Sequence, residues 1–97
     1  MPEKRWEAIR TDSGSINRGE ALFNAHCRYC HDPYSTRMKA GPGLMGLLRN
    51  PRLPFSNRPA TPENIREQLI HPVDHMPSFD HLREEEAEDL LSFLNTL

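Results

Sequence analysis

The sequence is short of hydrophobic residues and contains no long apolar run. Only 36% of its 97 residues are apolar, 7% are aromatic, and Trp6 is the single tryptophan. No apolar stretch is long enough to cross a membrane, and the first residues contain no signal-peptide segment. A chain of this length forms one domain with a thin core, and small domains usually need a disulfide, a metal or a cofactor for stability.

An excess of basic charge is also lacking. The formal net charge is −2, which gives no general attraction to nucleic acid or to an anionic membrane. Residues 1–58 hold ten Lys and Arg against five Asp and Glu, whereas residues 59–97 hold two against nine. If the two halves fold together, opposite charges on different faces would orient a partner. An equally good interpretation is that these charges only keep the surface solvated and orient no partner.

Only two cysteines are present, and both lie in the segment Cys27-Arg28-Tyr29-Cys30-His31. Two thiols at this spacing can each form a thioether with a haem vinyl group, and the histidine that follows is then directed at the iron. The segment therefore predicts one haem c, attached covalently through Cys27 and Cys30, with His31 as a metal ligand.

A Cys-x-x-Cys pair also occurs in disulfides, in thiol redox sites and as half of a zinc site. A redox motif of that type is expected near a βαβ pattern, and the sequence offers no convincing strands. A zinc site needs a second pair of ligands at short spacing, which His71, His75 and His81 do not complete. These absences favour haem attachment and leave the other three as minor alternatives.

Three helices and two loops are expected, which makes the fold all-α. Ser13-Gly14-Ser15 offers capping chemistry for a helix over about residues 16–29, ended by Asp32-Pro33. Thr61-Pro62-Glu63 starts a second helix that runs to about His71. A third helix is expected over about residues 83–96, with Ala87, Leu90, Leu91 and Leu94 at helical spacing. Residues 32–60 form a long irregular loop, which is plausible when it wraps a cofactor.

The best candidate for a second iron ligand is Met76, within His75-Met76-Pro77-Ser78-Phe79. Met76 precedes a proline and lies in the loop between the second and third helices. Its thioether is a soft donor that raises the potential of haem iron. His75 is the alternative ligand and would give a bis-histidine haem of lower potential, whereas His26, His71 and His81 are expected at the surface.

Over roughly residues 14–97 the chain resembles a class I c-type cytochrome. The residues that carry the resemblance occur in the family's order: Gly19 and Phe23, then Cys27, Cys30 and His31, then Gly41-Pro42-Gly43-Leu44, then Met76-Pro77, and then Leu90 to Leu94. The resemblance implies a cytochrome c fold in which three main helices and long loops wrap around one covalently bound haem. It adds Pro42 and Leu44 to the cofactor-binding residues and implies that the Pro42 carbonyl accepts from His31 Nδ1. It also implies that the aromatic residue of the last helix packs across Gly19 and Phe23.

The resemblance further implies a one-electron carrier rather than an enzyme. Its partners would be redox proteins that dock at an exposed haem edge near Arg28, Tyr29, Arg37 and Lys39, with the chain a monomer or weak dimer. Residues 1–13 would be an N-terminal extension and residues 14–97 the cytochrome domain, located in the periplasm or elsewhere outside the cytoplasm. An electron-transfer subunit of a larger oxidoreductase and a haem-based gas or peroxide binder are the alternatives.

The resemblance fails to supply partners for the haem propionates. The middle loop has no tryptophan for this role, and Arg49, Arg52, Asn57 and Arg58 are the substitutes that the sequence offers. Arg83 stands where the family often caps the last helix, so Asp80 is a second candidate for that cap.

Overall fold

A computed structural model describes residues 9–54, 56–72 and 76–97. The described residues form three α-helices and a short 3-10 helix, without a strand among them. These are α1 (Ser13–His26), η2 (Leu47–Arg49), α2 (Pro62–Ile70) and α3 (Glu84–Leu94). The expected all-α fold with three helices is confirmed for this part of the chain. No helix within it is long and apolar enough to cross a membrane.

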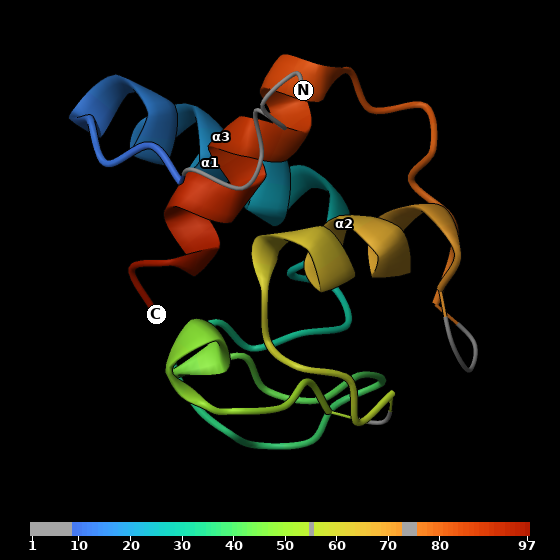
Figure 1. The fold of residues 1–97 in the computed structure, drawn as a ribbon. Coiled ribbons are helices and arrows are strands. Elements are labelled where there is room, and N and C mark those ends of the chain that lie inside the picture. The colour runs from blue at the N-terminus through green and yellow to red at the C-terminus, as the bar shows by residue number, and fades with distance from the viewer. Residues whose placement is uncertain (1–8, 55, 73–75) are drawn as a thin grey trace.

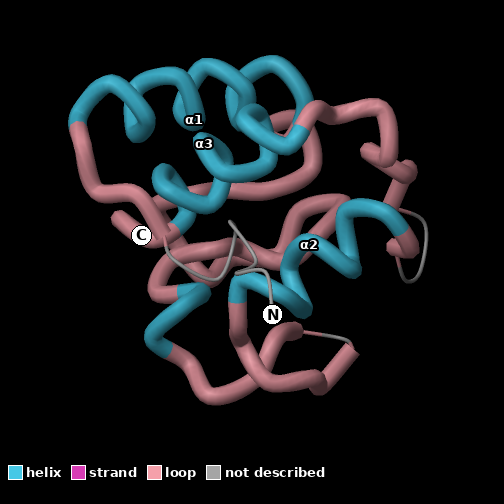
Figure 2. Tube along the Cα trace, turned by 45° about the horizontal axis from the view of Figure 1, so that its top comes forward, coloured by secondary structure: helices cyan, strands magenta, loops and turns pink. Residues whose placement is uncertain are grey.

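Helices α1 and α3 cross one another, and α2 lies apart from this pair (Figures 1 and 2). The crossing is close because Gly19 has no side chain: a Cβ there would overlap the backbone carbonyl of Asp89 and stand 3.0 Å from Phe93 Cβ. One turn further along α1, the rings of Phe23 and Phe93 pack with centroids 5.3 Å apart. The predicted packing of the last helix across Gly19 and Phe23 is therefore confirmed.

The predicted bounds of the first helix are wrong at both ends. Asp12 caps α1, since its carboxylate accepts from Ser15 N at 3.0 Å, and this hydrogen bond is the main reason that the pKa of Asp12 is lowered. The helix begins at Ser13 rather than at residue 16. It ends at His26, before the cysteine pair, because the chain then makes a separate turn over residues 27–30.

The second and third helices follow their expected starts. The Thr61 hydroxyl accepts from Asn64 N at 3.2 Å, and Pro62 is the first residue of α2. Arg83 is the N-cap residue of α3, and its N–H donates to the Glu86 carboxylate at 2.9 Å. The suggestion of a cap at Asp80 is therefore wrong, and α3 ends at Leu94, two residues before the predicted end.

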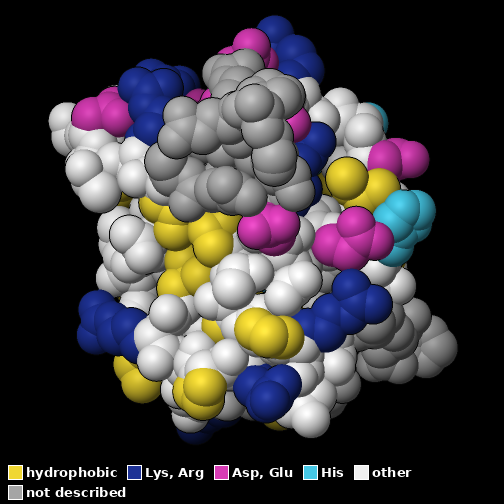
Figure 3. Space-filling model, viewed as in Figure 1, with side chains coloured by type: hydrophobic (Ala, Val, Ile, Leu, Met, Phe, Trp, Pro, Cys, Tyr) yellow, Lys and Arg dark blue, Asp and Glu magenta, His cyan; other side chains and the backbone are white. Residues whose placement is uncertain are grey.

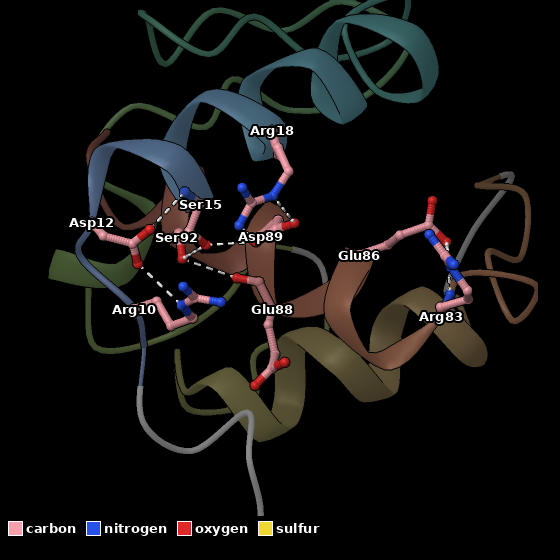
Figure 4. Close-up of polar contacts among 9 residues, drawn as sticks. All are labelled: Arg10, Asp12, Ser15, Arg18, Arg83, Glu86, Glu88, Asp89 and Ser92. Atoms are coloured by element: carbon pink, nitrogen blue, oxygen red, sulfur yellow. Dashed lines mark hydrogen bonds and ion pairs between the residues drawn. The ribbon is translucent and has the colours of Figure 1, made fainter.

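Polar side chains also join α1 to α3 (Figure 4). Buried Ser15 donates through its hydroxyl to Asp89 Oδ1 at 2.6 Å, and Arg18 Nε donates to Asp89 Oδ2 at 2.9 Å. Ser92 completes the cluster, with its hydroxyl 2.9 Å from that of Ser15 and 3.0 Å from the carbonyl of Glu88, to which it donates. This cluster was not predicted from the sequence.

The long middle loop is irregular, as expected. It contains η2 and an isolated bridge between Arg52 and Pro59. Its middle is tied to the C-terminus, because Gly46 N donates to Leu97 O at 3.0 Å. In Figure 3 the side chains over this loop include basic ones (Lys and Arg), whereas the acidic side chains visible on that face lie away from the loop. Of the N-terminal extension, Trp6 lies outside the described residues.

Candidate haem site

A pocket opens between the α1–α3 pair, α2 and the middle loop. It encloses about 550 Å³, part of which is open to solvent. The residues that line it come from every main element of the fold: Phe23, Cys27, His31, Pro42, Leu44, Leu47, Leu53, Pro54, Ile65, Gln68, Leu69, Met76, Leu90 and Leu94. Nearly all of these side chains are apolar, so the pocket suits a large and largely hydrophobic group.

The His31 ring is held in a fixed orientation. Its Nδ1 lies 2.7 Å from the carbonyl oxygen of Pro42, the contact that the sequence analysis expected. This contact requires Nδ1 to carry the proton and donate, which leaves Nε2 as the nitrogen able to bind a metal. Gly41 allows the ring to sit there, because a Cβ at this position would lie 2.5 Å from His31 Cε1.

The cysteine pair lies on one turn at the edge of the pocket. Cys30 N and His31 N both donate to Cys27 O, at 3.1 and 2.9 Å. This turn brings both thiols and the imidazole to the same region of the molecule. Cys27 is a pocket residue, and Cys27 and Cys30 are free thiols in the structure.

The environment of Cys27 does not favour thiol redox chemistry. Burial, and secondly the neighbouring thiol of Cys30, raise the pKa of Cys27 to about 11. Redox-active cysteines of Cys-x-x-Cys sites have lowered pKa values, because the thiolate is the attacking form. A zinc cluster is not indicated either, since the described residues contain no group of three or more His, Cys, Asp and Glu side chains that could hold a metal ion.

Met76 lines the same pocket as His31 and is half-buried. The chain that follows it is anchored to α2: Phe79 N donates to Leu69 O at 2.7 Å, and Ser78 Oγ donates to Ile70 O at 2.8 Å. The alternative ligand His75 lies outside the described residues. The structure therefore brings the thioether of Met76 and the imidazole of His31 to one pocket.

Of the other residues that the sequence suggested for the site, one lines the pocket and the rest are exposed. Leu44 is buried in the lining, as expected of a cofactor-binding residue, and His26, His71 and His81 are exposed. The suggested propionate partners are exposed and absent from the described lining: Arg49, Arg52, Asn57 and Arg58. Arg52 instead donates to the backbone carbonyl of Asn57 at 2.9 Å.

Gln68 is a lining residue that the sequence analysis missed. It follows Ile65 by three residues and precedes Leu69 on α2, so all three lie on one face of the helix. That spacing was the available signal. The position of Gln68 in the lining could not be predicted from its neighbours Glu67 and Leu69, because the sequence does not show that this face borders a pocket.

The residues of the pocket fit a covalently attached haem. Two thiols, an imidazole oriented by a carbonyl and a thioether would provide the attachment and ligand chemistry, and the apolar walls would surround the ring. Residues 14–94 match the family described as cytochrome C oxidase, cbb3-type, subunit III, a span that includes all four of these groups. No curated protein matches the chain. The chain belongs to this family of c-type cytochrome domains, whose cofactor is haem c.

Proposed function

We propose that the chain is a monohaem electron carrier that transfers one electron at a time between redox proteins. The observation that supports this most is the pocket that His31 and Met76 both line, where they would be the two protein ligands of one haem iron. When bound, haem supplies an iron that cycles between ferrous and ferric states. Because the protein would supply both of these ligands, no substrate would need to bind the metal, so we propose no enzymatic activity.

The protein's own residues define the environment of the cofactor. Cys27 and Cys30 would hold the cofactor by thioether bonds, which would keep it in place in both oxidation states. The Pro42 carbonyl orients His31 and increases the basicity of its ring. Leu44 and the other apolar lining residues would limit the contact of water with the cofactor, and an apolar site with a thioether ligand favours the reduced form.

The surface beside the cysteine pair is suited to brief docking of a redox partner. Tyr29 is 91% exposed between the two cysteines. Lys39 Nζ donates to Arg28 O at 3.0 Å, which places this exposed basic loop next to the same turn. We infer a small contact with a partner that carries acidic groups around an apolar centre. We also propose that the protein acts outside the cytoplasm as a monomer or weak dimer.

Replacement of Met76 tests the ligand assignment. Met76→Ala should lower the midpoint potential and let the reduced holoprotein bind CO, because the iron would lose one of its two protein ligands. Met45→Ala is the matched control, since Met45 is exposed and outside the pocket lining. The oxidised protein should show the weak near-infrared charge-transfer band that reports ligation by methionine sulfur. Only Met76→Ala should lose this band. An unchanged spectrum and potential in that variant would overturn the assignment, and loss of ligation in His75→Ala instead would support a bis-histidine haem.

The family match supports a second proposal, that the domain is an electron-transfer subunit or part of a larger oxidoreductase. The proposed carrier chemistry is the same in both cases, and only the lifetime of the partner contact differs. Purification of the natural protein at moderate ionic strength distinguishes them. A stable stoichiometric complex supports the subunit, and recovery as a free single chain supports the shuttle.

A further inference from the structure

An ion pair joins α2 to the start of α3. Arg66 Nη2 lies 3.0 Å from Glu84 Oε1, and only 21% and 33% of these two side chains are exposed. The other carboxylate oxygen, Glu84 Oε2, is buried and has no hydrogen-bond partner among the residues that the structure describes. Exposed ion pairs contribute little to stability, whereas removal of one partner from a buried pair leaves an uncompensated charge. We therefore expect the half-buried Glu84 carboxylate to depend on Arg66.

The same ion pair completes a ring of contacts around the segment that follows Met76. Residues 76–83 lead from Met76 to the N-cap of α3. Within this segment, Phe79 N donates to Leu69 O of α2 at 2.7 Å, and Leu69 lies about one helical turn after Arg66. The segment is thus attached to α2 at Phe79 and to α3 at its end. The ion pair fixes the distance between these two attachments.

A direct link between α2 and α3 matters because the pocket lies between these helices. Figure 1 shows α2 apart from the α1–α3 pair, and residues of both α2 and α3 line the pocket. A displacement of α2 away from α3 would widen the pocket. It would also carry Phe79, and with it Met76 three residues earlier in the chain, away from His31.

We propose that Arg66 and Glu84 are positioning residues whose ion pair keeps Met76 in place as the second protein ligand of the iron. This inference rests on the proposed His31/Met76 ligation. Neither residue lines the pocket, so both act through Met76. A thioether sulfur is a weak donor of electrons to its partners, and its retention depends on how firmly the chain around it is held. Without the ion pair, α2 and residues 76–83 move more freely, and Met76 leaves the iron in a larger fraction of molecules.

The rate of CO binding to the reduced holoprotein measures this effect, because under the proposed ligation CO binds only after Met76 has left the iron. Arg66→Gln and Glu84→Gln each remove the ion pair. Arg83→Gln is the matched control: Arg83 also lies at the start of α3 and pairs with Glu86 at 3.5 Å, but both partners belong to that end of α3 (Figure 4). The near-infrared band of the oxidised form, recorded against temperature, is the second measurement.

Each glutamine variant should bind CO about three- to tenfold faster than the natural protein, as expected for the loss of one partly exposed charged contact. The near-infrared band should disappear at a lower temperature in both. The double variant Arg66→Gln/Glu84→Gln should bind CO no faster than the single variants, because the same interaction is removed in all three. Arg66→Lys, which keeps the positive charge, should bind CO at a rate close to that of the natural protein, and so should Arg83→Gln.

An unchanged CO rate in folded Arg66→Gln and Glu84→Gln proteins would overturn the proposal. An equal acceleration in Arg83→Gln, or effects that multiply in the double variant, would overturn it too, because the cause would then be a general loss of stability. If the glutamine variants do not incorporate haem, the exchanged variant Arg66→Glu/Glu84→Arg decides. It restores the pair with the charges reversed, so a natural rate supports the proposal and an accelerated rate contradicts it.

Failure of the proposed ligation is distinguishable from failure of this inference. A natural protein that lacks the near-infrared band, or whose reduced form binds CO immediately, contradicts the His31/Met76 ligation itself. Both observations are made on the natural protein, before any variant of Arg66 or Glu84 is prepared.

Discussion

Asp89 shows how a charged side chain is stabilised inside a small helical domain. Its carboxylate is buried on α3, where it accepts hydrogen bonds from Ser15 and Arg18 of α1. Burial alone would raise the pKa of Asp89, but the hydrogen bonds from Arg18 and Ser15, together with the Arg18 charge, outweigh burial and lower it. The ionised form of Asp89 therefore favours the folded state.

We predict that Asp89 contributes to acid sensitivity. Because its folded pKa is below the unfolded value, its contribution to stability is complete above about pH 4 and is lost as the pH falls through the folded pKa. Asp89→Asn should reduce the free energy of unfolding at pH 7 by about 1–3 kcal/mol and weaken the pH dependence below about pH 4. Denaturant unfolding of the holoprotein at several pH values measures both. Asp80→Asn controls for the loss of one negative charge, and parallel acid profiles of natural and Asp89→Asn proteins would contradict the prediction.

At the scale of elements, the crossing of α1 over α3 depends on one glycine. A Cβ at Gly19 would meet the backbone of Asp89, which cannot rotate away as a flexible side chain would. Gly14, on the same helix, provides the contrast. A Cβ there would meet only the ends of the Arg18 and Asp12 side chains, at 3.3 and 3.4 Å.

Alanine substitutions at the two glycines should therefore have opposite effects. Gly19→Ala should reduce the free energy of unfolding by about 1–3 kcal/mol, because overpacking forces the helices apart. Gly14→Ala should be neutral or stabilising by up to about 1 kcal/mol, since alanine is the better helix former. Thermal unfolding of both holoproteins followed by circular dichroism measures the difference. Equal effects of the two substitutions would show that the crossing tolerates a side chain at Gly19.

Helix starts were predictable where the capping residues are unambiguous. Thr61, Pro62 and Glu63 carry separate signals for the start of α2, and the structure agrees with all three. The start of α1 was misjudged because Asp12 and Ser15 are both good capping residues, and only the three-dimensional structure shows that Ser15 is used in a different contact. Local signals compete in such cases, and tertiary packing decides between them.

At the scale of the whole molecule, the core and the pocket share their residues. Phe23, Leu90 and Leu94 are buried residues of the core and also line the pocket. An ion pair also connects two of the helices around the pocket: Arg66 of α2 and Glu84 of α3 are 3.0 Å apart. The cofactor would therefore complete the hydrophobic core, which explains how a chain with 36% apolar residues can form a stable domain.

Loss of the cofactor should consequently destabilise the whole domain. The Cys27→Ala/Cys30→Ala variant, isolated free of haem, is expected to lose helical circular dichroism and to unfold at a lower temperature than the holoprotein. The reason is that the apolar lining of the pocket would face water. Met45→Ala is the control: it keeps both cysteines, so it should retain haem and melt at the same temperature as the natural holoprotein. Equal melting temperatures with and without haem would contradict the shared-core interpretation.

The sequence by itself predicted the chemistry of attachment, because covalent haem binding needs two thiols and a histidine at one fixed local spacing. It also determined the all-α class and the start of α2, which depend on short-range capping and periodicity. Tertiary structure decided the rest. The pairing of Ser15 with Asp89, the position of Gln68 in the pocket and the exposure of Arg49 depend on contacts between distant segments. What Cys27 to His31 could not specify is which side chains surround the cofactor, because packing brings those residues together only when the chain folds.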